Sequence, residues 1–325
     1  MKLQTHIPTI KLPFKIDHHD SMCFFGSCFA EYIGNILLKQ KFDCLINPLG
    51  IGYNPISTIN LIQLDNEDID WKMAQKSNEV YFMYEFHSKF NNTKLSDFKS
   101  AICKAIEKKN QYLEKATVLF ISLGTAYTHR LISSNKIVTN CHKQPSAFFE
   151  RQLLEVNEIK KSLLGFTSHI NKTYKKEFQF VFTVSPVRHL KDGFRENQIS
   201  KSILHLAIDE CVKNNQGIHY FPAYEILMDD LRDYRFYDRD LLHPNYLAVE
   251  YIWEYFSRVF FSAETQNLNS EIAQAIKSLQ HKPFQKNTLM HQNFVKDLIA
   301  KIKLLSDEND LNFDHEILQL EAQLN

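Results

Sequence analysis

Short apolar runs that end at turn residues alternate with longer segments of helical periodicity over the first 260 residues. A run without polar alternation is typical of a strand buried on both faces, as in a parallel sheet. Strands that alternate with helices predict a parallel sheet with helices on both of its faces. The predicted strands are residues 22–25, 42–46, 118–123, 178–184 and 218–221, and the predicted helices are residues 29–41, 96–115, 155–174, 196–214 and 246–261.

Two parts of the chain depart from this alternation. Residues 55–95 are polar and aromatic without clear periodicity, and we interpret them as an insertion after the second strand. From residue 264 onward the pattern is helix and polar connection, which predicts a domain of residues 1–263 followed by a helical extension, residues 264–325. The extension carries no recognisable chemistry. A lid, a packing arm and a contact that forms a homo-oligomer are all open interpretations.

Composition restricts the class of protein. Lys+Arg and Asp+Glu both number 38, so the net charge is zero, and nothing indicates bulk attraction to nucleic acid or to an anionic membrane. The N-terminal residues 1–8 contain no apolar run that could form a signal peptide core, and no window approaches the roughly 18 apolar residues of a membrane helix. The six cysteines form no CxxC pair and are interpreted as free, largely buried thiols. We therefore expect a cytoplasmic protein without membrane insertion.

A serine follows the first predicted strand. Ser27 lies between this strand and a helix, at the carboxyl edge of the sheet, where open α/β folds place their sites. Gly26 before it permits a tight turn. The N-terminus of the helix favours the negative charge that forms when a hydroxyl attacks a carbonyl. Serine is also a preferred N-cap residue, so a structural role for Ser27 is the alternative.

A second motif lies more than two hundred residues later. Asp240 precedes His243 by three residues, in a loop that leads into a predicted helix. An aspartate at this spacing can accept one imidazole N–H and leave the other ring nitrogen to take a proton from the serine. The order Ser, Asp, His is one of several in which catalytic triads occur. A capping Asp and a surface His are the alternative interpretation.

Further motifs lie between these two, and with them the chain resembles the SGNH (GDSL-like) hydrolase superfamily, and more closely the GSCFA-domain family. The resemblance covers about residues 20–260 and is specific, because many motifs occur in order. Its motifs are Gly26-Ser27-Cys28-Phe29-Ala30, Asn47-Pro48-Leu49-Gly50, Tyr53-Asn54-Pro55, Leu123-Gly124-Thr125-Ala126-Tyr127, Asn140-Cys141-His142-Lys143, residues 185–193, 220–225 and 230–237, and the Asp240/His243 pair.

The resemblance implies a three-layer α/β/α fold of the flavodoxin-like type. It also implies Ser27 as nucleophile, His243 as general base and Asp240 as the residue that orients it. The oxyanion hole of the superfamily consists of the serine N–H, a glycine after the second strand and an asparagine after the third. Gly50 is the positional candidate for the glycine, with Gly52 as the alternative.

The third oxyanion donor departs from the superfamily pattern. Where relatives have an asparagine, this chain has Ala126, which has no side-chain donor. Loss of one such donor typically costs about 2.7–4 kcal/mol of transition-state stabilisation, so a substitute is expected. Asn140 is the first candidate, and the others are His142, Thr125, Tyr127 and His189.

The remaining predictions concern the substrate. Tyr127, His142, Arg188 and His189 are candidate substrate-binding residues, and Arg188 and His189 follow the fourth strand at the carboxyl edge. No residue spacing resembles a zinc site or a phosphate-binding glycine loop, so neither a metal nor another cofactor is expected. The first hypothesis is a metal-free serine esterase or acyl transferase that acts on small acyl esters, with O-acylated carbohydrates suggested by the resemblance alone. The second is a non-catalytic binding or scaffold protein on a hydrolase fold.

Overall fold

A parallel sheet forms the centre of the protein. The computed structural model describes residues 5–279 and 288–324. The central sheet has five strands in the order β10-β9-β5-β1-β2, and all of its neighbouring strands are parallel. The predicted α/β class with a parallel sheet is thereby confirmed. The strands are β1 (Ser21–Gly26), β2 (Asp43–Ile46), β5 (Val118–Leu123), β9 (Gln179–Val184) and β10 (Ile218–Tyr220).

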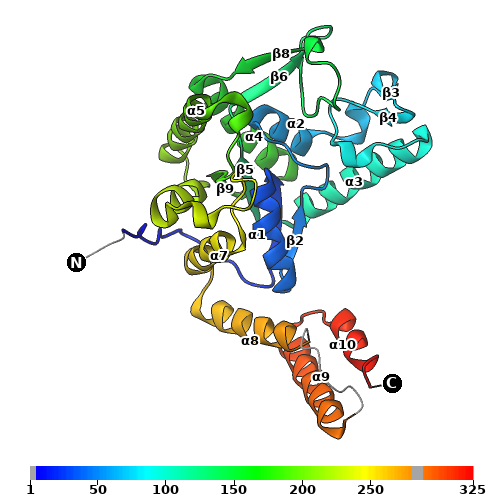
Figure 1. Ribbon diagram of the computed structural model, residues 1–325, viewed down its shortest axis with the longest axis vertical. Coiled ribbons are helices and arrows are strands. Elements are labelled where there is room, and N and C mark those ends of the chain that lie inside the picture. The colour runs from blue at the N-terminus through cyan, green and yellow to red at the C-terminus, as the bar shows by residue number, and fades with distance from the viewer. Residues whose placement is uncertain (1–4, 280–287, 325) are drawn as a thin grey trace.

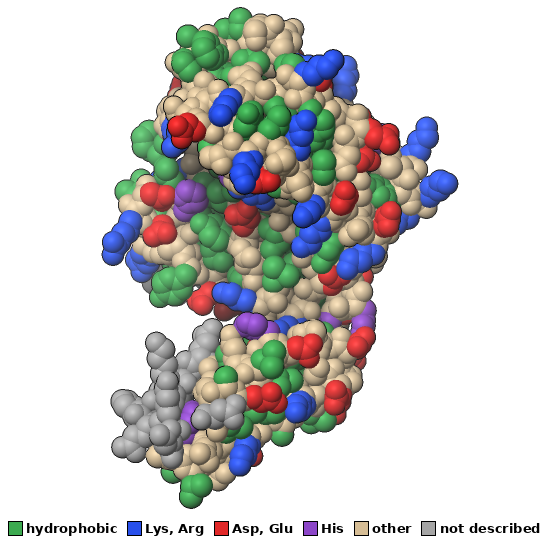
Figure 2. All heavy atoms as spheres, turned by 90° about the vertical axis from the view of Figure 1, so that its right-hand side faces the viewer, with side chains coloured by type: hydrophobic (Ala, Val, Ile, Leu, Met, Phe, Trp, Pro, Cys, Tyr) green, Lys and Arg blue, Asp and Glu red, His purple; other side chains and the backbone are tan. Residues whose placement is uncertain are grey.

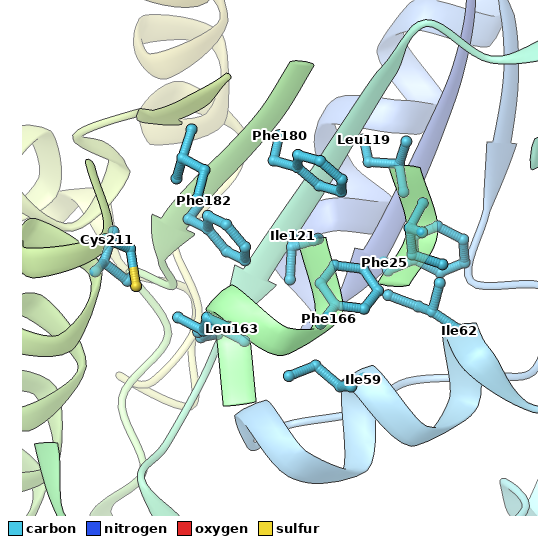
Figure 3. Close-up of a cluster of buried hydrophobic side chains, with 14 of the residues drawn as sticks. Phe25, Ile59, Ile62, Leu119, Ile121, Leu163, Phe166, Phe180, Phe182 and Cys211 are labelled. Carbon is cyan, nitrogen blue, oxygen red and sulfur yellow. The ribbon is translucent and has the colours of Figure 1, made fainter. Parts of the chain in front are cut away.

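Helices cover both faces of this sheet, in agreement with a three-layer α/β/α arrangement (Figure 1). Met22 and Phe24 of β1 pack towards α1 and α7, whereas Phe25 packs on the other face, towards α2 and α4. Figure 3 shows this second face, with strand and helix side chains in one apolar cluster. The covering helices are α1 (Cys28–Lys39), α2 (Pro55–Gln63), α3 (Leu95–Lys115), α4 (Val156–Tyr174), α5 (Phe194–Lys213) and α7 (Tyr246–Phe260).

The strand order defines where a site can form. β1 lies between β2 and β5. The chain therefore forms β2 on one side of β1, and it later forms β5 on the other side. Ligands of open α/β folds bind in the crevice outside the carboxyl ends of the strands at such a switch point. The first residues beyond β1 and β5 therefore lie at the edge where chemistry is expected.

Two small antiparallel sheets were not predicted. β6 (Tyr127–Leu131), β7 (Lys136–Val138) and β8 (Phe149–Leu153) form one, and β3 (Gln75–Ser77) and β4 (Val80–Phe82) form the other. Within the stretch interpreted as an insertion, α2 belongs to the layer over the sheet, because Ile59 and Ile62 are buried in its core. The short helical turns are η1 (Asn66–Asp68), η2 (Trp71–Met73), η3 (Ser88–Phe90), η4 (Ser146–Phe148), η5 (Leu190–Asp192), α6 (Ala223–Glu225), η6 (Ile226–Leu231) and η7 (Tyr234–Phe236).

The C-terminal helices pack around a hydrophobic cluster of their own. They are α8 (Ala263–Leu279), α9 (Leu289–Asn309) and α10 (Asp314–Glu321), and their cluster includes Ile272, Ile302 and Phe313. An ion pair of 2.7 Å between Lys41 Nζ and Glu316 links this part to the end of α1. Figure 2 shows acidic and basic side chains interspersed over the face that it presents. No helix within residues 5–279 and 288–324 is long and apolar enough to cross a membrane.

Candidate active site

The turn after β1 requires a glycine. Gly26 has a φ of +107°, and a Cβ on it would lie 2.1 Å from the carbonyl oxygen of Ser122. The absence of a side chain lets β1 and β5 remain paired to the end, so that the Ser27 N–H donates to this same carbonyl at 2.9 Å. The Gly26 N–H donates to Asn47 Oδ1 at 2.9 Å. The turn is thus tied to both neighbouring strands.

Ser27, the predicted nucleophile, is buried beneath this turn. Its exposed fraction is 1%. Its Oγ lies 2.8 Å from Ser122 Oγ and accepts the Phe29 N–H at 3.2 Å, as an N-cap of α1 does. Within the described part of the chain, no hydrogen bond joins Ser27 to His243. The geometry agrees with the alternative interpretation of Ser27 as a structural cap, and a nucleophilic role stays a prediction.

Asp240 and His243 form a hydrogen-bonded pair. His243 Nδ1 lies 2.6 Å from Asp240 Oδ2, and Asp240 Oδ1 accepts the N–H groups of Leu242 and His243 at 2.8 and 3.0 Å. Hydrogen bonds from the His243 backbone, the His243 ring and the Leu242 backbone lower the pKa of Asp240 to about 2. The carboxylate is therefore ionised at neutral pH. It orients the imidazole and leaves Nε2 without a partner among the described residues.

The loop that carries this pair is fastened to the loop after β9. The Arg188 N–H donates to the carbonyl oxygen of Leu242 at 3.1 Å. The next residue, His189, approaches the end of β5, because a Cβ on Gly124 would lie 2.8 Å from His189 Nε2. Residues that follow β5 and β9 thus meet the Asp240–His243 loop at the carboxyl edge of the sheet.

His189 has a buried, unpartnered ring nitrogen. Its Nε2 is buried and has no hydrogen-bond partner within the described residues. Burial lowers the pKa of His189 to about 3, and the charges of Lys201 and His243 lower it further in the same direction. The ring is edge-on to Tyr53 at a centroid distance of 5.5 Å. A neutral imidazole with a free nitrogen at the carboxyl edge of the sheet can donate one hydrogen bond to a ligand or accept one from it.

Sequence reasoning did not single out Cys28 or Tyr53. Cys28 is the first residue of α1 and is half-buried, whereas the cysteines were interpreted as largely buried. Burial raises the pKa of Cys28, and the neighbouring Tyr53 side chain opposes the rise. Position was the available signal, since the residue after an N-cap begins the helix and its side chain leaves the buried turn.

The predicted oxyanion donors have partners within the protein. The Ser27 N–H donates to Ser122, and the Gly50 N–H donates to the Asn47 carbonyl at 2.9 Å. Asn140 lies after β7, where its Oδ1 accepts the His142 N–H at 2.8 Å. An oxyanion role for Ser27 and Gly50 requires these hydrogen bonds to be exchanged for bonds to substrate, and the role of Asn140 stays a prediction.

Two predicted substrate-binding residues are engaged elsewhere. His142 Nε2 lies 2.8 and 3.0 Å from the carbonyl oxygens of Met83 and Phe86, and so joins the loop after β7 to residues of the stretch 55–95. Tyr127 begins β6, and the Arg151 guanidinium lies 3.5 Å from the centroid of its ring. Neither contact reaches the Asp240–His243 loop.

Arg188 lies at a hollow beside that loop. Its guanidinium is 4.2 Å from the Tyr237 ring centroid and 5.3 Å from that of Tyr234. These residues line a depression of about 270 Å³ together with Leu227, Met228, Asp229, Arg232 and Asp233. Two arginines, two aspartates and two aromatic rings share this hollow, with Arg232 and Asp229 3.9 Å apart, and this set suits a ligand with hydroxyl groups. Within the described part of the chain, no three His, Cys, Asp or Glu side chains are grouped to hold a metal ion.

Comparison with protein families assigns both parts of the chain. The model of the GSCFA family matches residues 21–256, which include the sheet and the Asp240–His243 pair. The model described as the C-terminal domain of GSCFA domain proteins matches residues 272–325. The resemblance drawn from the motifs ended near residue 260, and the second match extends it through the helical extension. No curated protein matches the chain.

Proposed function

The protein belongs to the GSCFA family, and from that premise we propose that it is an esterase or acyl transferase of the SGNH type. The observation that carries the proposal is the Asp240–His243 contact of 2.6 Å at the carboxyl edge of the sheet. A carboxylate that holds one imidazole nitrogen leaves the other available for proton transfer. Cytoplasmic localisation and a homo-oligomer through the C-terminal helices remain predictions from the sequence.

The proposed reaction passes through an acyl-enzyme on Ser27, the N-cap residue of α1. His243 Nε2 accepts the proton of the nucleophile as the nucleophile attacks the acyl carbonyl. Asp240 stabilises the imidazolium that forms. The imidazolium then protonates the departing alcohol, and the acyl group stays on the enzyme. Water or an acceptor hydroxyl, deprotonated by the same imidazole, releases the acyl group in the second half-reaction.

The substrate class follows from the hollow beside the loop. Arg188, Tyr234 and Tyr237 offer a cation and two aromatic faces within reach of the residues that neighbour His243. Such a surface suits an acyl ester whose alcohol part carries hydroxyl groups, and an O-acylated carbohydrate has this chemistry. The acyl group itself is small in this proposal.

The proposal is tested by hydrolysis of p-nitrophenyl acetate. We expect wild type to release nitrophenol above the buffer rate, and His243→Ala to lower the rate at least about a hundredfold. His169→Ala is the matched control, because His169 is an exposed histidine of α4. Wild-type and His243→Ala rates that are equal, with both proteins folded by circular dichroism, would exclude the proposal. To distinguish acyl transfer from hydrolysis, glucose is added and the products are analysed by mass spectrometry. Acetylated sugar indicates transfer.

A second candidate function is a non-catalytic binding or scaffold protein. The observation that favours it is that the N–H groups of Ser27 and Gly50, both predicted oxyanion donors, are already hydrogen-bonded within the protein. Ala126 offers no side-chain donor, and its N–H donates to Ser200 Oγ at 2.7 Å. Under this function, ligands bind the Arg188 hollow but esters are not turned over, and the same assay decides between the two.

A further inference from the structure

The His189 ring is held against the end of β5 by contacts with several elements. Its backbone N–H donates to Oδ1 of the buried Asn197 in α5 at 2.9 Å. A Cβ on Gly124 would lie 2.8 Å from His189 Nε2, so any side chain at this position would displace the ring. Tyr53 packs edge-on against the same ring. The imidazole is therefore fixed, with its Nε2 end at the first residue beyond β5.

That residue neighbours the turn that carries Ser27. β1 and β5 are paired in parallel up to Gly26 and Ser122. Ser27 follows at once, and its N–H donates to the Ser122 carbonyl oxygen at 2.9 Å. Gly124 is two residues beyond Ser122 and ends the same strand. His189 Nε2 therefore lies at the edge of the sheet from which the Ser27 turn leaves.

The loop that presents His189 also holds the loop of the proposed base. The Arg188 N–H donates to the carbonyl oxygen of Leu242, the residue before His243, at 3.1 Å. On the other side, the carbonyl oxygen of Val187 accepts a hydrogen bond of 2.9 Å from the buried Lys201 Nζ. Two imidazoles, those of His189 and His243, are thus carried by backbone segments that are hydrogen-bonded to each other.

The Nε2 atom of His189 lacks a partner although it is buried. No hydrogen bond reaches it within the described residues. A buried polar atom without a partner is costly, and a ligand that supplies an acceptor relieves the cost. Burial lowers the pKa of His189 to about 3, so the ring is neutral at pH 7. In the tautomer with the proton on Nε2, it is an uncharged donor at the edge of the sheet.

The other side chains considered as donors are engaged within the protein. Thr125 Oγ1 lies 3.0 Å from Ser200 Oγ and accepts the Tyr127 N–H at 3.1 Å. The Tyr127 ring lies under the Arg151 guanidinium. The Asn140 side chain accepts a backbone N–H in its own loop. None of these three therefore offers a buried donor that waits for a partner.

His142 is excluded by its tautomer. It has a buried, unpartnered nitrogen of its own, Nδ1. Its Nε2, however, lies 2.8 and 3.0 Å from the carbonyl oxygens of Met83 and Phe86, which only accept hydrogen bonds, so Nε2 carries the proton. Burial lowers the pKa of His142, so the ring is neutral and its Nδ1 has no hydrogen to donate. His189 is the candidate that remains.

We propose that the Nε2–H group of His189 is the side-chain donor of the oxyanion hole, the role that Ala126 cannot fill. The role rests on the proposed acyl transfer through Ser27, and it names the group that stabilises the developing charge. A donor fixed in advance at the oxygen that becomes negative stabilises the transition state. His189 is then a catalytic residue, because its N–H contacts the reacting carbonyl oxygen.

The donor keeps its proton throughout the reaction. As Ser27 Oγ forms a bond to the acyl carbon and loses its proton to His243, the carbonyl electron pair moves onto the oxygen, which accepts the hydrogen bond from His189. The carbonyl re-forms when the bond from the acyl carbon to the alcohol oxygen breaks, and the alcohol takes the proton from His243. The same hydrogen bond forms again when water or an acceptor hydroxyl attacks the acyl-enzyme.

The first experiment measures kcat and KM for p-nitrophenyl acetate. We expect His189→Ala to lower kcat about 10²- to 10³-fold and to leave KM within about threefold, since the hydrogen bond strengthens in the transition state. His189→Gln restores an amide N–H and should recover at least about tenfold of this loss. His219→Ala is the matched control and should keep the wild-type kcat, because His219 is a buried histidine of β10 whose Nε2 already bonds Gln179 at 2.6 Å.

The outcomes of this assay separate the two proposals. A wild type that turns over the ester, with an equal kcat in a folded His189→Ala protein, overturns the role of His189 and leaves the proposed function in place. Loss of rate in His189→Ala that appears as a raised KM, with kcat unchanged, also overturns it, because the residue then binds the ground state. A folded wild type without turnover contradicts the proposed function itself, and the donor role falls with it.

The second experiment needs no ester and is made on wild type. Histidine side chains are labelled with ¹⁵N, and two-bond couplings between ring nitrogens and ring protons show which nitrogen carries the proton at pH 7. The His189 signals are identified by their loss in His189→Gln. We expect a neutral ring with its proton on Nε2. A proton on Nδ1 leaves Nε2 without a hydrogen to donate and overturns the assignment, whatever the turnover of the variants.

Discussion

The hydroxyl oxygens of Ser27 and Ser122 lie 2.8 Å apart at the end of the β1–β5 pair. Both residues are buried, at 1% and 2% exposure. Ser27 also caps α1 through the Phe29 N–H. One serine thus joins two neighbouring strands of the sheet and the helix that leaves it.

Replacement of Ser27 is expected to destabilise the fold. Ser27→Ala removes the cap of α1 and leaves Ser122 Oγ without this partner, so we expect the free energy of unfolding to fall by about 2–3 kcal/mol. Urea denaturation measures the change. Ser122→Ala and the double variant complete a double-mutant cycle, in which the pair should show a coupling of about 0.5 kcal/mol or more. Additive effects of the two substitutions would contradict the assigned hydrogen bond.

Gly26 is expected to tolerate no side chain. In Gly26→Ala the new Cβ meets the Ser122 carbonyl oxygen at 2.1 Å with a φ of +107°, so we expect a loss of about 3 kcal/mol or more. Gly165→Ala is the matched control, because its Cβ has no atom within 4 Å and it lies inside α4. There alanine should stabilise by up to about 1 kcal/mol. Thermal denaturation of both variants checks the contrast, and a Gly26→Ala protein as stable as wild type contradicts it.

Asp240 is expected to matter for catalysis more than for stability. Its side chain is 44% exposed, so Asp240→Asn should leave the melting temperature nearly unchanged. The amide cannot hold the imidazolium as the carboxylate does, so turnover of p-nitrophenyl acetate should fall about 10²- to 10⁴-fold. Asp209→Asn, at an exposed ion pair on α5, should keep the wild-type rate. An unchanged rate in Asp240→Asn would show that the pair is not the catalytic base.

Lys201 makes stability depend on pH above neutrality. Its Nζ is buried and donates to the carbonyl oxygens of Ser185 and Val187 at 2.6 and 2.9 Å. Burial lowers its pKa to about 7, against about 10.4 in the unfolded chain. Between these values the unfolded state binds more protons, so the stability contribution of this site rises with pH, by at most about 1.4 kcal/mol per pH unit.

The measurement compares wild type with Lys201→Met from pH 6 to pH 10. The other titrating groups cancel in the difference between the two proteins. We expect the stability of wild type to rise relative to Lys201→Met above about pH 7 and to level off near pH 10. If the unfolding free energies of the two proteins run parallel over this pH range, the pKa of Lys201 is the same in the folded and the unfolded state.

Hydrophobic periodicity and the positions of turn residues were sufficient to predict the main architecture. The five strands and all the covering helices except α2 agree with their predicted ranges to within about two residues, because each buried parallel strand is a local apolar run that ends at turn residues. The small sheet β7-β6-β8 was missed. Its strand β6 contains His129 and Arg130, and it is held by pairing with β8, some twenty residues away, which no local pattern records.

Local sequence placed a serine in the turn after β1 and paired Asp240 with His243, since both features are encoded within a few neighbouring residues. It did not show that Ser27 is buried against Ser122. That burial depends on the register of β1 against β5, which places the serine hydroxyl beside Ser122. Burial arises here from contacts between segments about a hundred residues apart, so only the folded chain decides it.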